Sequence, residues 1–266
     1  MKIILTSLLL LSLQSCSNAP KKVGIKEPQT LTEAVTSSYR STENMKRDQF
    51  RHPHETLSFF NLKPDMTVIE ITPSRGWYTE IIAPFLNEKG QYIIAEPKTD
   101  PRGYTVPRQE WFKKHPEIKS KTVTFQPGTE INLGDDNSAD LVLTFRNIHN
   151  WLPEKNVEEA FKHIFKVLKP GGILGVVEHR ANPKIKFDPK SGYMLEKDVI
   201  RMIEKAGFRL QGKNEINANP KDKANHPHGV WSLPPSLRGG EQDKEKYMAI
   251  GESDRMTLKF IKPASK

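Results

Sequence analysis

Residues 66–77 read MTVIEITPSRGW and decide the fold of this chain. Residues 66–71 are apolar and rich in β-branched side chains, which is typical of a buried strand. Residues 77–86 carry an apolar face at helical spacing, and Pro84 bends or shortens that helix. The segment therefore predicts a strand, a tight turn and a helix in direct succession.

The same alternation of strand and helix continues to the end of the chain. An amphipathic helix is predicted over 157–168, ending at the Pro-Gly-Gly turn of 169–172, and another over 195–206. This alternation predicts an α/β fold with a Rossmann-like, doubly wound sheet, mostly parallel. The last strand is expected to be antiparallel, because no strong helix precedes it. The further strands are expected at 91–95, 122–125, 140–145, 173–177, from 208 onward and at 256–261.

The first residues are typical of a bacterial export signal. Lys2 precedes an apolar stretch, residues 3–13, that is too short to span a bilayer as a stable helix. The stretch ends in LQSC, which resembles a lipobox, and Cys16 is the single cysteine. We expect a signal peptide over 1–15, a lipid anchor at Cys16 that holds the protein to a membrane, and a periplasmic location. The alternative is an ordinary signal peptide with an incidental cysteine.

Composition divides the remaining chain into three parts. Residues 16–30 are polar and predict a flexible tether. Residues 31–266 form one domain, which begins with a helical lead-in over 31–60. Residues 214–254 are a long insertion rich in Pro, Asn, Asp and Gly, and loops of that length are usually functional or disordered.

The overall charge restricts the class of partner. The formal net charge is +9, but the Lys and Arg residues are scattered and form no basic block. We therefore expect no nucleic-acid partner, while the oligomeric state stays open.

The turn after the first strand carries a candidate ligand site. Glu70 is followed at two-residue intervals by Thr72, Ser74 and Gly76. This pattern resembles motif I of class I S-adenosylmethionine (SAM)-dependent methyltransferases, an acidic residue followed by three alternating glycines that let the backbone approach the ligand. Here two glycines are replaced by small hydroxyl residues. The resemblance implies SAM as cofactor and these four residues as part of its site; the alternative is a turn without a ligand.

Further landmarks of that superfamily follow in order. Glu96 ends the second strand 20 residues after Gly76, where an acid accepts hydrogen bonds from ribose hydroxyls. Thr129 follows the third strand, near the place where the superfamily contacts adenine, and Asn147 follows the fourth strand. We assign both residues to the cofactor site.

Most of the chain, from about 31 to 263, also resembles a narrower family, the predicted periplasmic or exported methyltransferase-like proteins of bacteria. That resemblance implies the fold and a methyltransferase activity, but no substrate. It is carried by the segments Arg47-Asp48, Arg51-His52-Pro53, 76–80 (GWYTE), 144–151 (TFRNIHNW), Glu178-His179-Arg180, 215–220 (EINANP), Gly229-Val230-Trp231 and 251–255 (GESDR).

Polar residues after the fourth and fifth strands are expected to border one cleft, because parallel strands end at the same edge of a sheet. His149 is a candidate general base, or else it braces the following helix. Arg146 and Arg180 are suited to bind a carboxylate or phosphate, or else they pair with Glu178 or Glu70. No ligand spacing supports a metal site from the histidines, so none is assigned.

The insertion contains a candidate lid for this cleft. Trp231, Pro234 and Pro235 would cover its mouth, with Asn217 and Asn219 at the base of the lid. The alternative is a surface loop held down by one buried tryptophan.

These patterns favour a SAM-dependent methyltransferase that is exported to the envelope and acts on a small or envelope-associated substrate. Because SAM is made in the cytoplasm and the glycine motif is degenerate, two alternatives remain. One is a non-enzymatic, ligand-binding lipoprotein on a degenerate methyltransferase scaffold. The other is an enzyme of different chemistry that uses Arg146, His149 and His179. Fold alone does not decide among them.

Overall fold

A computed structural model describes residues 26–152 and 154–264 of the chain. The predicted signal peptide, Cys16 and most of the predicted tether lie outside the described residues. Within those residues, no helix has the length and apolar character needed to cross a bilayer.

One eight-stranded sheet organises the molecule, in the order β4-β3-β2-β1-β5-β6-β8-β7. The pairs β1–β2, β1–β5, β2–β3 and β5–β6 are parallel, whereas β4 and β8 run antiparallel to their neighbours. The predicted Rossmann-like, mostly parallel sheet with an antiparallel last strand is confirmed. The strands are β1 (Thr67–Ile71), β2 (Gln91–Glu96), β3 (Lys121–Gln126), β4 (Glu130–Asn132), β5 (Ala139–Phe145), β6 (Leu168–His179), β7 (Arg209–Asn214) and β8 (Arg255–Ile261).

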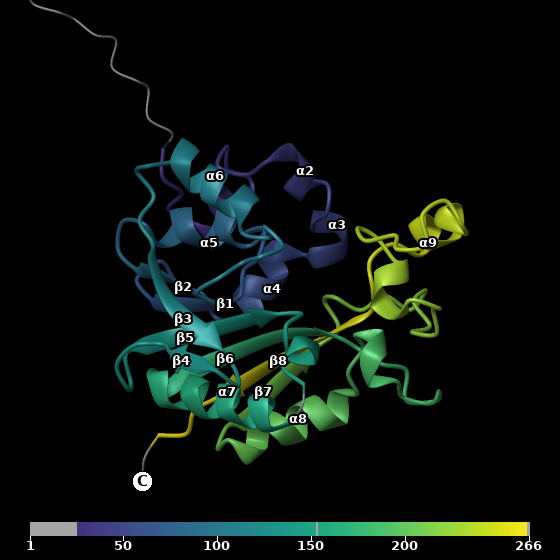
Figure 1. The fold of residues 1–266 in the computed structure, drawn as a ribbon. Coiled ribbons are helices and arrows are strands. Elements are labelled where there is room, and N and C mark those ends of the chain that lie inside the picture. The colour runs from purple at the N-terminus through teal and green to yellow at the C-terminus, as the bar shows by residue number, and fades with distance from the viewer. Residues whose placement is uncertain (1–25, 153, 265–266) are drawn as a thin grey trace, which may run out of the picture.

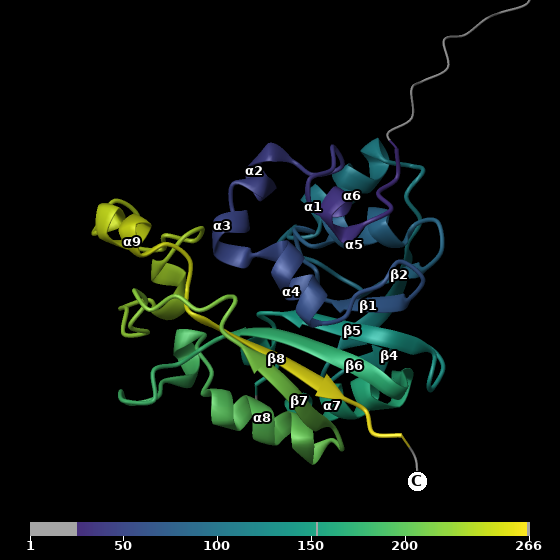
Figure 2. The ribbon, with the colours of Figure 1, turned by 180° about the vertical axis from the view of Figure 1, so that it is seen from behind.

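Helices cover both faces of the sheet. The first six lie on one face and α7 and α8 on the other, as Figures 1 and 2 show from opposite sides. The helices are α1 (Leu31–Val35), α2 (Thr42–Met45), α3 (Asp48–Arg51), α4 (Pro53–Phe59), α5 (Thr79–Leu86), α6 (Val106–Lys114), α7 (Glu154–Val167), α8 (Glu196–Lys205) and α9 (Lys244–Ile250).

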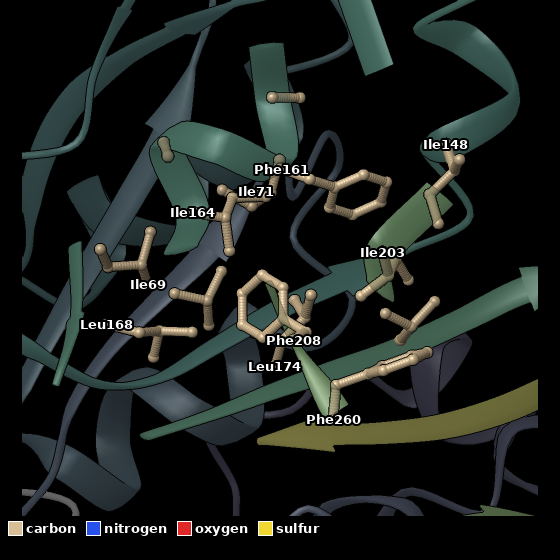
Figure 3. Packing of buried hydrophobic residues seen from close by; sticks show 14 of the residues in the cluster. Ile69, Ile71, Ile148, Phe161, Ile164, Leu168, Leu174, Ile203, Phe208 and Phe260 are labelled. Carbon is tan, nitrogen blue, oxygen red and sulfur yellow. The ribbon is translucent and has the colours of Figure 1, made fainter. Parts of the chain in front are cut away.

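Two hydrophobic clusters hold these layers together, one on each side of the sheet. Successive residues of a strand point to opposite faces. Val68 accordingly packs in the cluster under α5, whereas Ile69 and Ile71 pack in the cluster under α7. Figure 3 shows the second cluster, in which Phe161 and Ile164 of α7 lie among the strand side chains.

Three of these helices and strands were not predicted from the sequence. The short edge strand β4 forms a hairpin with β3, α6 lies between β2 and β3, and α9 lies within the predicted insertion. The end of the predicted tether also contacts the domain: Pro28 is buried, and Gln29 donates a hydrogen bond to Glu88 at the end of α5. Ordered structure therefore begins before residue 31.

The insertion between β7 and β8 contains α9 and a short 3-10 helix, Gly229–Ser232. Figure 1 shows this segment beyond the sheet, on the side where β8 begins. The buried carboxylate of Asp222 holds it, because that carboxylate accepts hydrogen bonds from Tyr193, His226 and the amide of Asp254. Since Arg255 pairs with His179 at the end of β6, the insertion lies at the carboxyl edge of the parallel strands.

Candidate functional site

The turn that follows β1 keeps the backbone shape of a glycine loop although two of its three glycines are replaced. Thr72 has a φ of 45°, Ser74 of 53° and Gly76 of 83°. Left-handed backbone is unfavourable for residues with a Cβ, and most of all for a β-branched one such as threonine. The amide nitrogens of Ser74 and Arg75 donate to no other described residue. The turn therefore presents free N–H groups at the carboxyl edge of the sheet.

Glu70 lies inside the sheet layer instead of in this turn. Its carboxylate is buried and accepts a 2.5 Å hydrogen bond from the Tyr92 hydroxyl, which lies 2.8 Å from the hydroxyl of Thr79. Burial raises the pKa of Glu70 to about 7, although the Tyr92 bond opposes this shift. The residue thus connects β1 to β2 and to the start of α5.

Glu96 ends β2 as predicted, but it already has a partner. The Arg108 guanidinium of α6 binds the Glu96 carboxylate at 2.6 Å and the Ser74 carbonyl at 3.0 Å. A Cβ placed on Gly76 would meet the Arg108 side chain at 2.8 Å, so that side chain occupies the space beside the turn. Only one Glu96 oxygen, Oε2, is used; Oε1 accepts no hydrogen bond from the described residues.

The two remaining residues assigned to the cofactor site lie apart. The Asn147 amide is buried and donates to the Ile71 carbonyl at 2.8 Å, so it ties the end of β5 to the end of β1. Thr129 is exposed in the β3–β4 turn.

On the other side of the β1 turn, His149 and His179 lie side by side, with ring centroids 5.3 Å apart. Glu178 is fully buried between them and accepts from His149 Nδ1 at 3.0 Å and from the Ile148 amide at 2.7 Å. His179 Nδ1 shares a 2.6 Å hydrogen bond with Ser253. Burial, together with the positive charges nearby, lowers the pKa of His179 well below its usual range, so its ring is neutral at pH 7.

These three residues are also the one group among the described residues whose ligand atoms are close enough to share a metal ion, all lying within 4.8 Å of one another. The Glu178 oxygens already accept three hydrogen bonds. Nearby arginines add positive charge, which opposes a divalent cation. A further histidine, His226, lies outside this group and binds Asp222 instead.

The two predicted anion-binding arginines have different surroundings. Arg180 is saturated by carboxylates, with Asp254 at 2.9 Å and Glu215 at 2.6 Å, so it has a structural role. Arg146 is half-buried, and its guanidinium makes no hydrogen bond or ion pair with any described residue. Its backbone is left-handed, with a φ of 62°. Burial and the neighbouring Arg255 guanidinium lower the pKa of Arg146 to about 10.

Sequence reasoning gave no role to three further arginines that surround Arg146. Arg47 is the N-cap residue of α3, Arg51 ends that helix and Arg255 begins β8, and each binds the single carboxylate of Glu252. We call these four residues, Arg47, Arg51, Arg146 and Arg255, the arginine cluster. All four fall in segments that carry the narrower family resemblance, but no local spacing relates α3 to β8.

Of the residues predicted to form a lid, Trp231 lies beside the histidine pair. The Trp231 ring lies 6.1 Å from the His149 ring, edge to face, and Arg238 lies over Trp231. Asn217 donates to Thr56 and Thr257, and Asn219 donates to backbone carbonyls of the insertion. The two asparagines therefore hold the insertion in place.

Comparisons with known proteins bear on the fold. A family profile described as a methyltransferase domain matches residues 101–176, less than half of the chain. A SAM-dependent methyltransferase from Aquifex aeolicus is 18% identical with a TM-score of 0.56, and the alignment covers 82% of this chain and 93% of that one. The [4+2]-cyclase SpnF is 15% identical with a TM-score of 0.58, covering 88% and 92%. Among curated proteins, no sequence matches this chain.

The chain therefore has the class I methyltransferase fold, over nearly the full length of both solved structures. The segment matched by the profile begins after Glu96, so it contains neither the 72–76 turn nor the acid at the end of β2. It does contain Arg108, Arg146 and His149.

Proposed function

We propose that this protein is a SAM-dependent methyltransferase. The observation that carries the proposal is the 72–76 turn, which keeps three left-handed residues and two free amides although only one of the three is a glycine. The fold and the methyltransferase-domain match support it. These groups fit the cofactor, because free N–H donors and the unused Glu96 Oε1 are what a nucleoside requires at this edge.

In this proposal, SAM supplies the methyl group when bound, and the protein positions the acceptor beside it. Glu96 accepts from the ribose hydroxyls. Glu178 holds His149 through Nδ1, which leaves His149 Nε2 to accept a proton from the acceptor atom. The substrate class proposed is a small or envelope-associated molecule.

Titration calorimetry of the full-length protein with SAM and S-adenosylhomocysteine tests the assignment. Glu96→Ala should weaken binding at least about tenfold, because a charge-assisted hydrogen bond contributes about 1.5–3 kcal/mol. Glu130→Ala, which removes an exposed carboxylate on β4, is the matched control. No heat with either ligand would reject the methyltransferase, and an equal effect of both variants would overturn this placement of the ligand.

One observation favours a second function, a non-enzymatic ligand-binding protein on the same scaffold. The Arg108–Glu96 ion pair fills the space beside Gly76 and satisfies the ribose acid without a ligand. The fold is also shared by a protein named a [4+2]-cyclase, so it does not by itself imply methyl transfer.

We also propose export to the bacterial envelope and anchoring at Cys16, supported by the lipobox-like LQSC at 13–16. Cys16→Ser should move the protein from the membrane fraction to a soluble exported fraction, because the acyl chains provide the anchor. A wild-type protein found wholly in the soluble fraction would overturn this proposal.

A further inference from the structure

The arginine cluster has more positive charge than its protein surroundings balance. Arg47, Arg51 and Arg255 lie 2.6 Å, 3.1 Å and 2.6 Å from the oxygens of Glu252. Arg146 is close enough to lower the pKa of Arg51, yet it has no carboxylate of its own. Although burial opposes ionisation of Glu252, the surrounding arginines hold its pKa well below the usual range. Four cations therefore share one anion.

Among the described residues, Glu252 is the one carboxylate that forms ion pairs with the cluster. Glu178 is oriented towards His149 and backbone amides, and Glu70 towards Tyr92, so neither forms an ion pair with these arginines. Asp254 and Glu215 bind Arg180, and Asp48 binds Arg40. Like charges held together away from water repel one another strongly, so such an arrangement is costly unless an anion joins it.

Two donors in the cluster have no partner. The buried Arg47 Nη2 makes no hydrogen bond within the described part of the chain, and neither does the Arg146 guanidinium. Buried polar groups are almost always hydrogen-bonded, so the unpartnered Arg47 Nη2 calls for an explanation. A guanidinium is also the group best suited to bind phosphate oxygens in pairs.

The position of the cluster is that of a ligand site. Arg146 directly follows β5, and Arg255 lies opposite His179 at the end of β6. Aromatic rings form the surroundings: Trp77 lies against Arg51 at 4.7 Å, and Tyr78 stacks on Phe145. Ser253 accepts from Arg255 and also bonds His179, which connects the cluster to the histidine pair.

We propose that the arginine cluster binds a phosphate-type dianion carried by the ligand of this protein. A dianion matches the charge excess better than a monocarboxylate. The claim that this dianion belongs to the methyl acceptor rests on the proposed function. The claim that the arginine cluster binds a dianion does not depend on the proposed function.

Titration of the full-length protein with inorganic phosphate, against sodium chloride at equal ionic strength, tests the site. Wild type should bind phosphate, and Arg146→Gln should weaken binding at least about tenfold. Arg146→Lys should lose less, because it keeps the charge but not the paired donors. Arg209→Gln removes an exposed charge on β7 and should leave binding unchanged. Because the Arg146 side chain makes no hydrogen bond with the described residues, the melting temperatures of its variants should not fall below that of wild type.

Three results would overturn the proposal: phosphate binding no stronger than chloride binding, equal binding by the Arg146 and Arg209 variants, or acetate binding as tight as phosphate. Phosphatidic acid vesicles distinguish the source of the anion. Vesicle binding that depends on Arg146 supports a lipid headgroup as the source. If the protein binds inorganic phosphate but does not bind the vesicles, the source is a soluble phosphate ester. SAM is titrated in parallel, so phosphate binding without SAM binding would keep this site and remove only the methyl transfer.

Discussion

The two halves of the carboxyl edge differ in how their charges are matched. Beside the β1 turn, Glu96 and Arg108 form a one-to-one pair. In the arginine cluster, four guanidinium groups share the carboxylate of Glu252. In the first half the ion pair balances its own charges, although the amides of Ser74 and Arg75 stay free among the described residues, whereas the second half carries an excess of positive charge that a bound anion would relieve. A ligand must therefore compete with Arg108 for Glu96 in the first half and meets unbalanced guanidinium groups in the second.

Removing the single anion of the cluster is expected to have the largest effect. Glu252→Gln should lower the free energy of unfolding by about 3–5 kcal/mol, because it leaves buried guanidinium groups uncompensated. Since the arginines depress the pKa of Glu252, its contribution is fully present at neutral pH and is lost only as acid protonates it. Urea denaturation at pH 7 measures the change.

The matched control is Glu215→Gln, whose partner Arg180 keeps Asp254 and whose side chain is 66% exposed. It should cost less than about 1 kcal/mol. Added phosphate should restore part of the Glu252→Gln loss and none of the Glu215→Gln loss. Equal losses of unfolding free energy in the two variants would contradict the prediction that the arginine cluster depends on the Glu252 carboxylate.

A series of stability measurements at different pH values tests the role of Glu70 in the half beside the β1 turn. Burial raises the pKa of Glu70 to about 7, above the ordinary value of 4.5, so the folded protein holds a proton that the unfolded chain releases. Stability should therefore fall as the pH rises between these values. Glu70→Gln has no such loss, and it should gain more than about 1.4 kcal/mol relative to wild type between about pH 5 and pH 8. A surface variant, Glu88→Gln, should show no such gain. The prediction would be refuted if the difference in stability between Glu70→Gln and wild type did not change with pH.

The competition in the first half can be measured directly. Arg108→Ala removes the internal partner of Glu96 and opens the space beside Gly76. We expect SAM to bind about fivefold more tightly, roughly 1 kcal/mol, in titration calorimetry. Lys113→Ala, on the exposed side of α6, should leave the affinity unchanged. Weaker binding by Arg108→Ala would mean that Arg108 positions Glu96 for the ligand.

The smallest effect is expected at the turn itself. Thr72 has a left-handed φ of 45°, so Thr72→Gly relieves strain while adding entropy to the unfolded chain. The net change should lie between zero and about 1 kcal/mol of stabilisation. Thr122→Gly, at an extended position in β3, should instead destabilise by about 1 kcal/mol. Thermal melting compares the stabilities of the two variants. If Thr72→Gly lost as much stability as Thr122→Gly, the left-handed conformation of Thr72 would be unstrained.

Much of the fold could be predicted from the sequence because its signals are local. Short apolar runs predicted β1, β2 and β5, the first of them rich in β-branched side chains, and the amphipathic pattern predicted α7 and α8. The missed helix α6 reads VPRQEWFKK, which has no apolar stripe, and β4 is a three-residue edge strand. Elements without periodic burial leave no pattern for sequence reasoning to find.

The candidate site was predictable only in part, for a related reason. Glu96, Arg146, His149 and the 72–76 turn follow strand ends, and the rule that parallel strands end at one edge places them together. That rule does not show which side chains already have partners. Arg108 binds Glu96 from a helix the sequence did not reveal, and Arg180 proved to be saturated while Arg146 did not.

The sequence by itself determined the alternation of strands and helices and the positions where polar residues leave the sheet. The tertiary structure alone brought Arg47 and Arg51 of α3 to Arg255 of β8, more than 200 residues away, around one carboxylate. The periodicity of apolar residues in a sequence indicates which element a residue belongs to and whether it faces the core. The matching of charges depends on distances between distant segments, and only the folded chain sets those distances.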